Sequence, residues 1–424
     1  MSLMGTGSAD RAIKQEEVRR ICAEFFEQEN LRGKRVLAVI PDNTRTAPID
    51  VFFPVLYDIF ADRPNRLDFL IALGTHPPMS EAAIDKRLGL RPGVRASRYP
   101  NVRVFNHAWK DPSTLRSVGT LSAEDVNKLS HGLLHKPVNV TVNRLVMEYD
   151  VVLIIGPTFP HEVVGFSGGN KYLFPGISGQ DIIDMFHWLG ALMTSPVIIG
   201  RKRTPVRAVV DAAASLLPTK RLCMSLVVSG KSLLGLYCGT PEEAWSAAAD
   251  LSSSVHVKFF TRPFRSVLSC PAPMYDELWV AAKAAYKLEP VVADGGELII
   301  YAPHLREISV THGAFIEQVG YHVRDYFASR MAEFSHIPGG VLAHSTHVKG
   351  VGTYVHGKET PRITVTLATG IPRESCERVN LGYRDPRSVN PSEWQDKEDE
   401  GKLYVPDAGE TLYRLHNDPF PEFS

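Results

Sequence analysis

The chain has 424 residues, of which 44% are apolar and 22% charged; this is the composition of a globular protein, and the length favours two domains. Lys plus Arg and Asp plus Glu both number 47, so no net charge would draw the whole protein to nucleic acid or to an anionic membrane. The five cysteines include no CxxC pair, which argues against a disulfide framework and fits a reducing cytoplasm. No run reaches the roughly 18 apolar residues of a membrane span. We therefore expect a cytoplasmic protein that binds any anionic ligand through local groups.

The first 260 residues alternate amphipathic helices with short apolar strands. After an N-terminal lead that we expect to be disordered, a helix is predicted over 16–28. The predicted buried strands are 35–40, 68–73, 102–105, 150–155 and 222–228, and further helices are predicted at 205–216 and 241–255. The run at 138–146 alternates as an edge or antiparallel strand does. Strands that alternate with helices predict a parallel sheet covered by helices.

A second domain is predicted after a crossing at 256–264. Its strands are expected at 266–270, 297–302 and 363–367, with a helix that begins at Asp276 or Glu277. The sequence therefore predicts an α/β fold of two domains, each a largely parallel sheet flanked by helices, with an active-site cleft between the domains. The predicted ranges are 1–260 for the N-terminal domain, 265–392 for the C-terminal domain, and 393–424 for a tail that packs back on the surface or on the N-terminal domain.

Polar clusters follow four of the predicted strands of the first domain. The carboxyl ends of parallel strands meet at one edge of a sheet, so these clusters predict a shared pocket. Its expected members are Asp42, Arg45, His76, His107 and His161. Two plainer interpretations stay open: Asp42 or Thr44 caps the next helix, and each histidine alone is an ordinary satisfied polar residue.

The segment 156–190 carries the densest group of reactive residue types. A turn of Ser167, Gly168 and Gly169 lets the backbone approach a ligand or adopt positive φ, and Lys171 follows it. A helix that begins near Ser178 would carry His187. A lone lysine or histidine would be unremarkable here, but their concentration after one strand favours a functional site.

Imidazoles, an arginine and lysines together suit proton transfer on an anionic substrate. If His76 and His161 lie on opposite sides of the substrate, they can remove and return a proton, as the inversion of a stereocentre requires. Lys283, in the second domain, is either a further ligand of the anion or an exposed helix lysine. Imidazole binds Zn, Cu, Fe and Ni, and no HExxH spacing is present, so histidine spacing alone names no metal.

Several motifs resemble those of the nickel-pincer-nucleotide-dependent lactate racemases. They are DNTR at 42–45, GTHPP at 74–78 and PHEVVGFSGGNKYLFPG at 160–176, with His187 sixteen residues after Lys171. The long central motif is specific, whereas DNTR or GTH alone would be weak. The resemblance covers most of the first domain and extends thinly into the second through the segment from Trp279 to Lys283.

The resemblance implies a nickel ion and a pyridinium-3,5-bisthiocarboxylic acid mononucleotide, attached covalently at Lys171, with His187 as the nickel ligand. It implies that His76 and His161 are the acid/base pair and that Arg45 and Lys283 hold the substrate carboxylate. The residues implied to bind the cofactor are Asp42, Thr44, Ser167, Gly168, Gly169, Lys171 and Trp279. The implied reaction is racemisation or epimerisation of a 2-hydroxy acid by proton-coupled hydride transfer through a 2-keto acid. Cofactor-biosynthesis proteins are the implied partners.

Two residues depart from that family's pattern. Trp279 and Val280 stand where the lactate enzymes usually have a Tyr-Gln pair, so we expect a larger or more apolar 2-hydroxy acid than lactate. Two other classes of function remain open from the sequence. One is a non-catalytic binder of a carboxylate or nucleotide, and the other is a zinc-dependent hydrolase that uses the same histidines.

Overall fold

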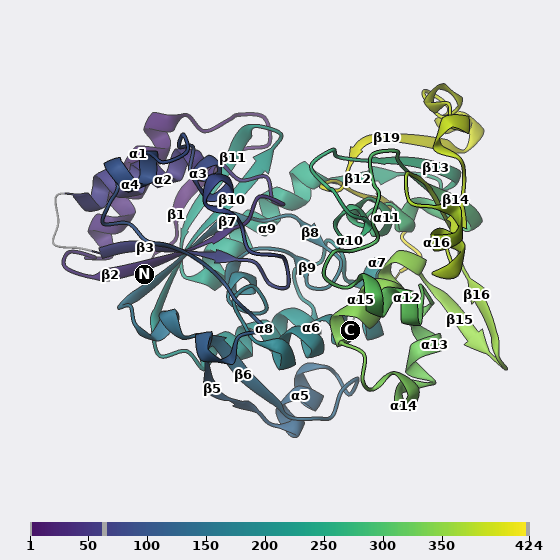
Figure 1. Cartoon of the computed structure of the whole chain (residues 1–424). Coiled ribbons are helices and arrows are strands. Elements are labelled where there is room, and N and C mark those ends of the chain that lie inside the picture. Colours follow the sequence, from purple (N-terminus) through teal and green to yellow (C-terminus); the bar gives the residue numbers. More distant parts are fainter. Residues whose placement is uncertain (1, 62–65, 421–424) are drawn as a thin grey trace. The chain divides into compact units, whose positions relative to one another are not determined.

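The computed structural model describes residues 2–61 and 66–420. The protein has the predicted α/β fold, and the chain divides into two compact units (Figure 1). The first unit contains Met1–Phe159, Ser167–Ile183 and Arg207–Val255, and the second contains Pro160–Phe166, Asp184–Val206 and His256–Ser424. The switch at residue 256 lies near the predicted boundary at 260, whereas the two short segments of the second unit were assigned by sequence to the N-terminal domain.

The first unit is built on a seven-stranded sheet of order β1-β11-β10-β7-β2-β3-β4. The strands are β1 Met4–Gly7, β2 Arg35–Pro41, β3 Arg66–Ala72, β4 Val104–Asn106, β7 Val151–Pro157, β10 Lys220–Ser229 and β11 Ser232–Gly239. The five strands from β10 to β4 are parallel, as predicted, and only β1 and β11 run antiparallel to their neighbours. In the register of β2 and β3, Pro41 lies opposite Ala72, so these two strands end side by side.

The prediction of a disordered N-terminal lead is wrong, because Met4–Gly7 pairs with β11 along the edge of this sheet. Gly5 has φ +123°, and a Cβ at this position would lie 2.0 Å from the carbonyl oxygen of Leu236. Backbone hydrogen bonds and a glycine that permits close approach hold this strand. The strand has only four residues, two of them glycines, so the sequence shows no hydrophobic periodicity from which a strand could be predicted.

Helices and a hairpin complete the first unit. The helices are α1 Gln15–Gln28, α2 Ile49–Ala61, α3 Glu81–Arg87, α4 Val94–Arg98, α5 Ala123–Leu129, α8 Pro205–Ser215 and α9 Pro241–His256. The run predicted as an edge or antiparallel strand is β6 Val138–Asn143, which pairs antiparallel with β5 Leu115–Leu121. A short turn, η3 Gly169–Tyr172, carries Lys171.

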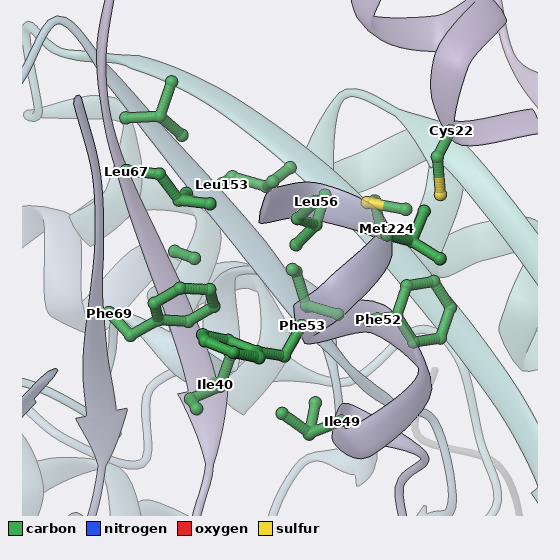
Figure 2. Close-up of a cluster of buried hydrophobic side chains, with 14 of the residues drawn as sticks. Cys22, Ile40, Ile49, Phe52, Phe53, Leu56, Leu67, Phe69, Leu153 and Met224 are labelled. Atoms are coloured by element: carbon green, nitrogen blue, oxygen red, sulfur yellow. The ribbon is translucent and has the colours of Figure 1, made fainter. Parts of the chain in front are cut away.

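A continuous apolar core fixes α1 and α2 against the sheet. On α1 the buried residues recur at helical spacing, from Val18 to Phe26. On α2 the ring of Phe53 packs against Phe69 of β3, with ring centroids 5.3 Å apart. Figure 2 shows Phe53 near Ile40 and Phe69, in the same buried cluster as Leu153 and Met224 of the central strands. Each buried phenylalanine stabilises the fold by about 1.5–3 kcal/mol, so the strands that lead into the site rest on a rigid base.

The second unit is built on a wholly parallel five-stranded sheet of order β18-β17-β14-β13-β19. Its strands are β13 Phe264–Pro271, β14 Val292–Ala302, β17 Thr364–Thr369, β18 Gly382–Tyr383 and β19 Lys402–Ala408. The C-terminal segment thus supplies an edge strand, and β20 Leu412–Leu415 pairs with β12 Val257–Phe260. Two further pairs are β8 Pro160–His161 with β9 Gly165–Phe166, and β15 Gly352–Val355 with β16 Lys358–Pro361.

The helices of the second unit are short. They are α7 Ser195–Ile198, α10 Leu278–Ala281, α11 Lys283–Tyr286, α12 Gly313–Val319, α13 Arg324–Ala328, α14 Met331–Phe334, α15 Gly339–Lys349 and α16 Arg373–Arg378. The helix predicted after Asp276 is therefore two pieces, with Glu277 as the N-cap of the first. The change of unit after Ile183 falls within α6 Gln180–Met193, which carries His187.

Candidate active site

The ends of β2 and β3 bring Asp42 and His76 into contact. Asp42 is 4% exposed, and its Oδ2 lies 2.6 Å from Nδ1 of His76. Its Oδ1 accepts hydrogen bonds from the backbone N of Thr44 at 3.1 Å and from Thr44 Oγ1 at 2.7 Å. Asp42 therefore closes a local turn and orients an imidazole, and α2 begins only at Ile49.

Electrostatics keep Asp42 ionised. Burial alone would raise the pKa of this carboxyl, but His76, Arg45 and Thr44 outweigh burial and hold the pKa below its ordinary value. An ionised carboxylate only accepts hydrogen bonds, so Nδ1 of His76 must carry the hydrogen. In the neutral ring Nε2 is then the basic nitrogen. The pair is arranged as a histidine oriented for proton transfer.

The loop that carries Lys171 lies beside this pair. The backbone N of Gly74, two residues before His76, donates to the carbonyl oxygen of Gly176 at 2.9 Å. Tyr172 packs on β7, since a Cβ at Gly156 would lie 2.2 Å from its ring. Arg45 and Asp42 both act electrostatically on the Tyr172 hydroxyl, whose pKa burial raises. The first unit therefore gathers Asp42, Arg45, His76 and Lys171 on adjoining loops.

Arg87 belongs to this group and was missed by the sequence analysis. Its Nε donates to the carbonyl oxygen of Pro41 at 3.3 Å, and its Nη1 donates to that of Ala47 at 3.3 Å. Burial lowers the pKa of Arg87, while Asp42 and Tyr172 act in the opposite direction. Arg87 ends a helix and does not follow a strand, so nothing in the sequence distinguished it from an exposed helix arginine.

His107 is not the pocket residue that the strand-end pattern predicts. It is 2% exposed, its Nε2 lies 2.9 Å from the carbonyl oxygen of Ser178, and its Nδ1 lies 3.2 Å from Nδ2 of Asn143. Nε2 must donate to the carbonyl, which leaves Nδ1 to accept from the amide. Burial lowers the pKa of His107 to about 4, so the ring is neutral at physiological pH. Both nitrogens are engaged, and the residue is structural.

In the second unit, His161 sits in the β8–β9 pair and is 9% exposed. Its Nδ1 lies 3.1 Å from the backbone N of Val163 and 3.3 Å from Oε2 of Glu162. The N–H donor suits the neutral ring, whose Nδ1 accepts, and the carboxylate suits the protonated ring, whose Nδ1 donates. Nδ1 of His161 therefore has a backbone donor and a carboxylate beside it.

His187 projects from α6 and is partly buried. Its ring makes an edge contact with Phe186, with centroids 5.0 Å apart. The start of α15 packs here: the backbone N of Gly340 donates to Oδ1 of Asp184 at 3.1 Å, and a Cβ at Gly340 would lie 3.9 Å from Nδ1 of His187. An alanine at 340 would therefore make ordinary van der Waals contact with this imidazole.

Trp279 is held between two histidines that sequence reasoning did not assign to the site. The centroid of its ring lies 4.0 Å from that of His344, in a stacked arrangement, and 4.3 Å from that of His312. Nε2 of His344 lies 3.1 Å from the carbonyl oxygen of Trp279, and burial lowers the pKa of His344 to about 3. His312 is the N-cap of α12. Nζ of Lys283 lies 4.7 Å over the ring of Tyr275.

Within residues 2–61 and 66–420, no helix is long and apolar enough to cross a membrane. The same residues contain no group of three or more His, Cys, Asp and Glu side chains placed to hold a metal ion.

Comparison with known proteins identifies relatives of the chain. Residues 8–197 match the model of the lactate racemase N-terminal domain. The lactate racemases of Thermoanaerobacterium thermosaccharolyticum and Lactiplantibacillus plantarum are each 22% identical, over 281 and 294 residues. Both matches cover 65% of this chain, and they cover 61% and 62% of those enzymes, so the chain spans about three fifths of their length.

Solved structures extend the likeness to nearly the whole chain. The crystal structure of a Thermotoga maritima protein is 31% identical with a TM-score of 0.88, over 97% of this chain and all of the other. The apoprotein of the T. thermosaccharolyticum lactate racemase has a TM-score of 0.73 at 16% identity, over 95% of this chain and 93% of that one, which shows a shared fold. Residues 8–197 of the chain are therefore a lactate racemase N-terminal domain.

Proposed function

We propose that this protein is a racemase or epimerase of a 2-hydroxy acid that carries a nickel-pincer pyridinium mononucleotide on Lys171. The observation that carries the proposal is the 2.6 Å contact between Asp42 and His76 beside the loop of Lys171. An imidazole oriented by a buried carboxylate is suited to move a proton, and the adjoining lysine offers an amine for covalent attachment. The 22% identity to two lactate racemases supports the same class of reaction.

The residues present fit such a cofactor. The imidazole of His187 is a donor that suits nickel. Nη2 of Arg87 is buried and makes no hydrogen bond within the described residues, and a guanidinium there suits a phosphate or carboxylate. Lys171 would hold the group covalently and His187 would ligate its metal. The other residues proposed to bind it are Asp42, Thr44, Ser167, Gly168, Gly169 and Trp279. When bound, the group supplies an acceptor for hydride from the substrate α-carbon and returns it to the resulting 2-keto acid.

The proposed acid/base pair is His76 of the first unit and His161 of the second. His76 contacts the Asp42 carboxylate, and His161 contacts the backbone N of Val163 and the Glu162 carboxylate. One ring accepts the hydroxyl proton as the α-carbon is oxidised, and the other supplies a proton when the opposite face is reduced. The carboxylate of the substrate is proposed to bind Arg45 and Lys283.

Trp279 and Val280 indicate the substrate class. The indole stacks on His344 and packs against His312 in a tilted arrangement, and Val280 is 5% exposed. A rigid apolar ring favours a substrate with an apolar side chain, and the loss of a glutamine amide removes a partner for a small polar one. We therefore propose a 2-hydroxy acid larger than lactate. A cytoplasmic location and loading by cofactor-biosynthesis proteins complete the proposal.

The first test is the intact mass of protein purified from its native host. A covalent adduct on the wild-type chain and its loss in Lys171→Arg, which keeps the charge but cannot form the same linkage, are the expected results. A wild-type chain of unmodified mass from that host would contradict the cofactor proposal.

The second test incubates the loaded protein with single enantiomers of lactate and of larger aliphatic and aromatic 2-hydroxy acids, followed by chiral chromatography. We expect conversion of at least one larger acid. Loaded protein that inverts none of them, yet binds one equally well as wild type and as His76→Gln, would show a binding protein. Zinc in the purified protein with no adduct would instead favour a hydrolase.

A further inference from the structure

Side chains from α8 and α9 hold the backbone of the turn that precedes Lys171. Nε1 of Trp245 donates to the carbonyl oxygen of Ser167 at 2.9 Å. The same indole covers both glycines: a Cβ at Gly168 would lie 3.3 Å from its Cδ1, and one at Gly169 would lie 2.9 Å from its Cβ. Trp245 is 8% exposed, so this is an interior contact.

Arg207 also holds the backbone of this turn. Its Nη1 donates to the carbonyl oxygen of Gly168 at 3.3 Å, and its guanidinium carbon lies 4.1 Å over the ring of Trp245. Burial lowers the pKa of Arg207 to about 10, with Asp211 and Glu242 acting in the opposite direction, so the side chain is a cation at neutral pH. A buried cation stacked on the indole fixes the ring that covers the glycines.

Asn170 ties the next residue to the same two helices. Its Nδ2 donates to Oδ1 of Asp211 at 2.9 Å and to Oε1 of Glu242 at 2.7 Å, and the residue is 1% exposed. The carbonyl oxygens of Ser167 and Gly168 and the side chain of Asn170 are therefore held by polar contacts from α8 and α9.

Ordinary core packing does not account well for this arrangement. Apolar side chains of similar volume would stabilise an interior as well as buried charges do, because desolvation offsets most of their attraction. Here the polar atoms are directed at the backbone of one turn. That turn contains Gly168 at φ +91° and Gly169 at φ +58°, and glycine has the most backbone freedom to lose.

We propose that Trp245 and Arg207 are positioning residues that fix the Ser167–Gly169 backbone, so that Lys171 presents its amine from one place. The proposal deepens the function above and rests on the attachment role of Lys171. It predicts that weakening either contact loosens this turn locally and lowers cofactor attachment, while the sheet below keeps its structure.

The test compares Trp245→Phe with Trp394→Phe by amide hydrogen exchange. The matched control also removes a buried indole donor, since Nε1 of Trp394 bonds Oγ of Ser266 at 2.9 Å in the second unit. In Trp245→Phe we expect exchange about 5-fold faster or more at the amides of Ser167 and Lys171, which donate to Phe159 and Gly168, with β7 unchanged. Arg207→Lys should show the same local change and carries the measurement if Trp245→Phe does not fold.

Adduct mass gives the second readout. A fall of about 5-fold or more in the modified fraction for Trp245→Phe and Arg207→Lys, with Trp394→Phe like wild type, supports the proposal. Exchange at Ser167 and Lys171 that matches between Trp245→Phe and Trp394→Phe overturns it, as does full modification of a loosened turn. If wild type carries no adduct while the turn still loosens, the attachment role of Lys171 is refuted and the contact is purely structural.

Discussion

His76 and His107 follow neighbouring parallel strands of one sheet, and their chemistry differs because their partners differ. His76 meets the ionised Asp42 at the end of the adjacent strand, so one nitrogen is oriented and the other is the basic one. His107 meets a carbonyl and an amide, which engage both nitrogens in a buried site. A histidine after a strand is thus only a candidate. The charge and exposure of the groups beside it decide whether it moves protons or supports the fold.

The largest expected effect is on His76. In loaded protein, His76→Gln should lower kcat by about 10²–10⁴, because one member of the acid/base pair is lost. Chiral chromatography measures the rate, and the melting temperature should stay close to that of wild type because His76 is partly exposed. His135→Gln, an exposed histidine, is the control. Unchanged turnover in His76→Gln would contradict the assignment of His76, in contrast to His107, to proton transfer.

His107 should show the opposite pattern, a large effect on stability with little on turnover. His107→Phe leaves the carbonyl of Ser178 and the amide of Asn143 without their partner, so we expect a loss of about 1–3 kcal/mol at neutral pH by denaturant unfolding. A loss of turnover at unchanged stability would place His107 in the chemistry.

The same group should contribute to acid unfolding. Its pKa falls from 6.5 to about 4 on folding, so the unfolded chain binds the proton first, and wild type loses about 3 kcal/mol as pH falls from about 7 to 4. His107→Phe lacks this contribution, and its deficit should shrink or reverse at pH 4. A constant difference between the two proteins from pH 7 to 4 would contradict the neutral, buried assignment.

Asp42→Asn tests the partner that makes the two histidines different. It removes the charge opposite His76 and Arg45 while the imidazole remains, so we expect kcat to fall by about 10²-fold, less than for His76→Gln at its strongest. As a control, Asp58→Asn removes an exposed carboxylate of α2 and should leave kcat unchanged. Equal rates for Asp42→Asn and wild type would show that the carboxylate serves only the fold.

The sheets were predictable where burial leaves a continuous apolar signal. β2 and β7 coincide with their predicted runs to within two residues, because parallel strands covered on both faces are apolar throughout. β1 was not predictable, since its four residues include two glycines and form no apolar run, and neither was the place of 160–166 in the second unit. Local pattern carries no signal for contacts made by another part of the chain.

The sequence identified several residues of the site, but it did not identify most of the residues that they contact. Asp42 and His76 were named from their strand ends, and the structure joins them. Arg87, at the end of a helix, and His344, inside another helix, were not, because helical histidines and arginines are common on surfaces. Trp245 and Arg207 contact a turn that is distant from them in the sequence, so these contacts can be recognised only in the folded structure.

The smallest effect is expected from Thr44→Val, which removes one donor to Asp42 and keeps the shape. The backbone N of Thr44 still bonds Oδ1, so the loss should be about 1 kcal/mol and turnover should fall about 3-fold or less. Because folding lowers the pKa of Asp42, its stabilisation is present above about pH 4 and is lost at lower pH, and Thr44→Val reduces that stabilisation. The variant should therefore be less stable than Thr46→Val at pH 7, and the gap should narrow on acidification. A gap that widens in acid would mean that Thr44 does not act through the carboxylate that distinguishes His76 from His107.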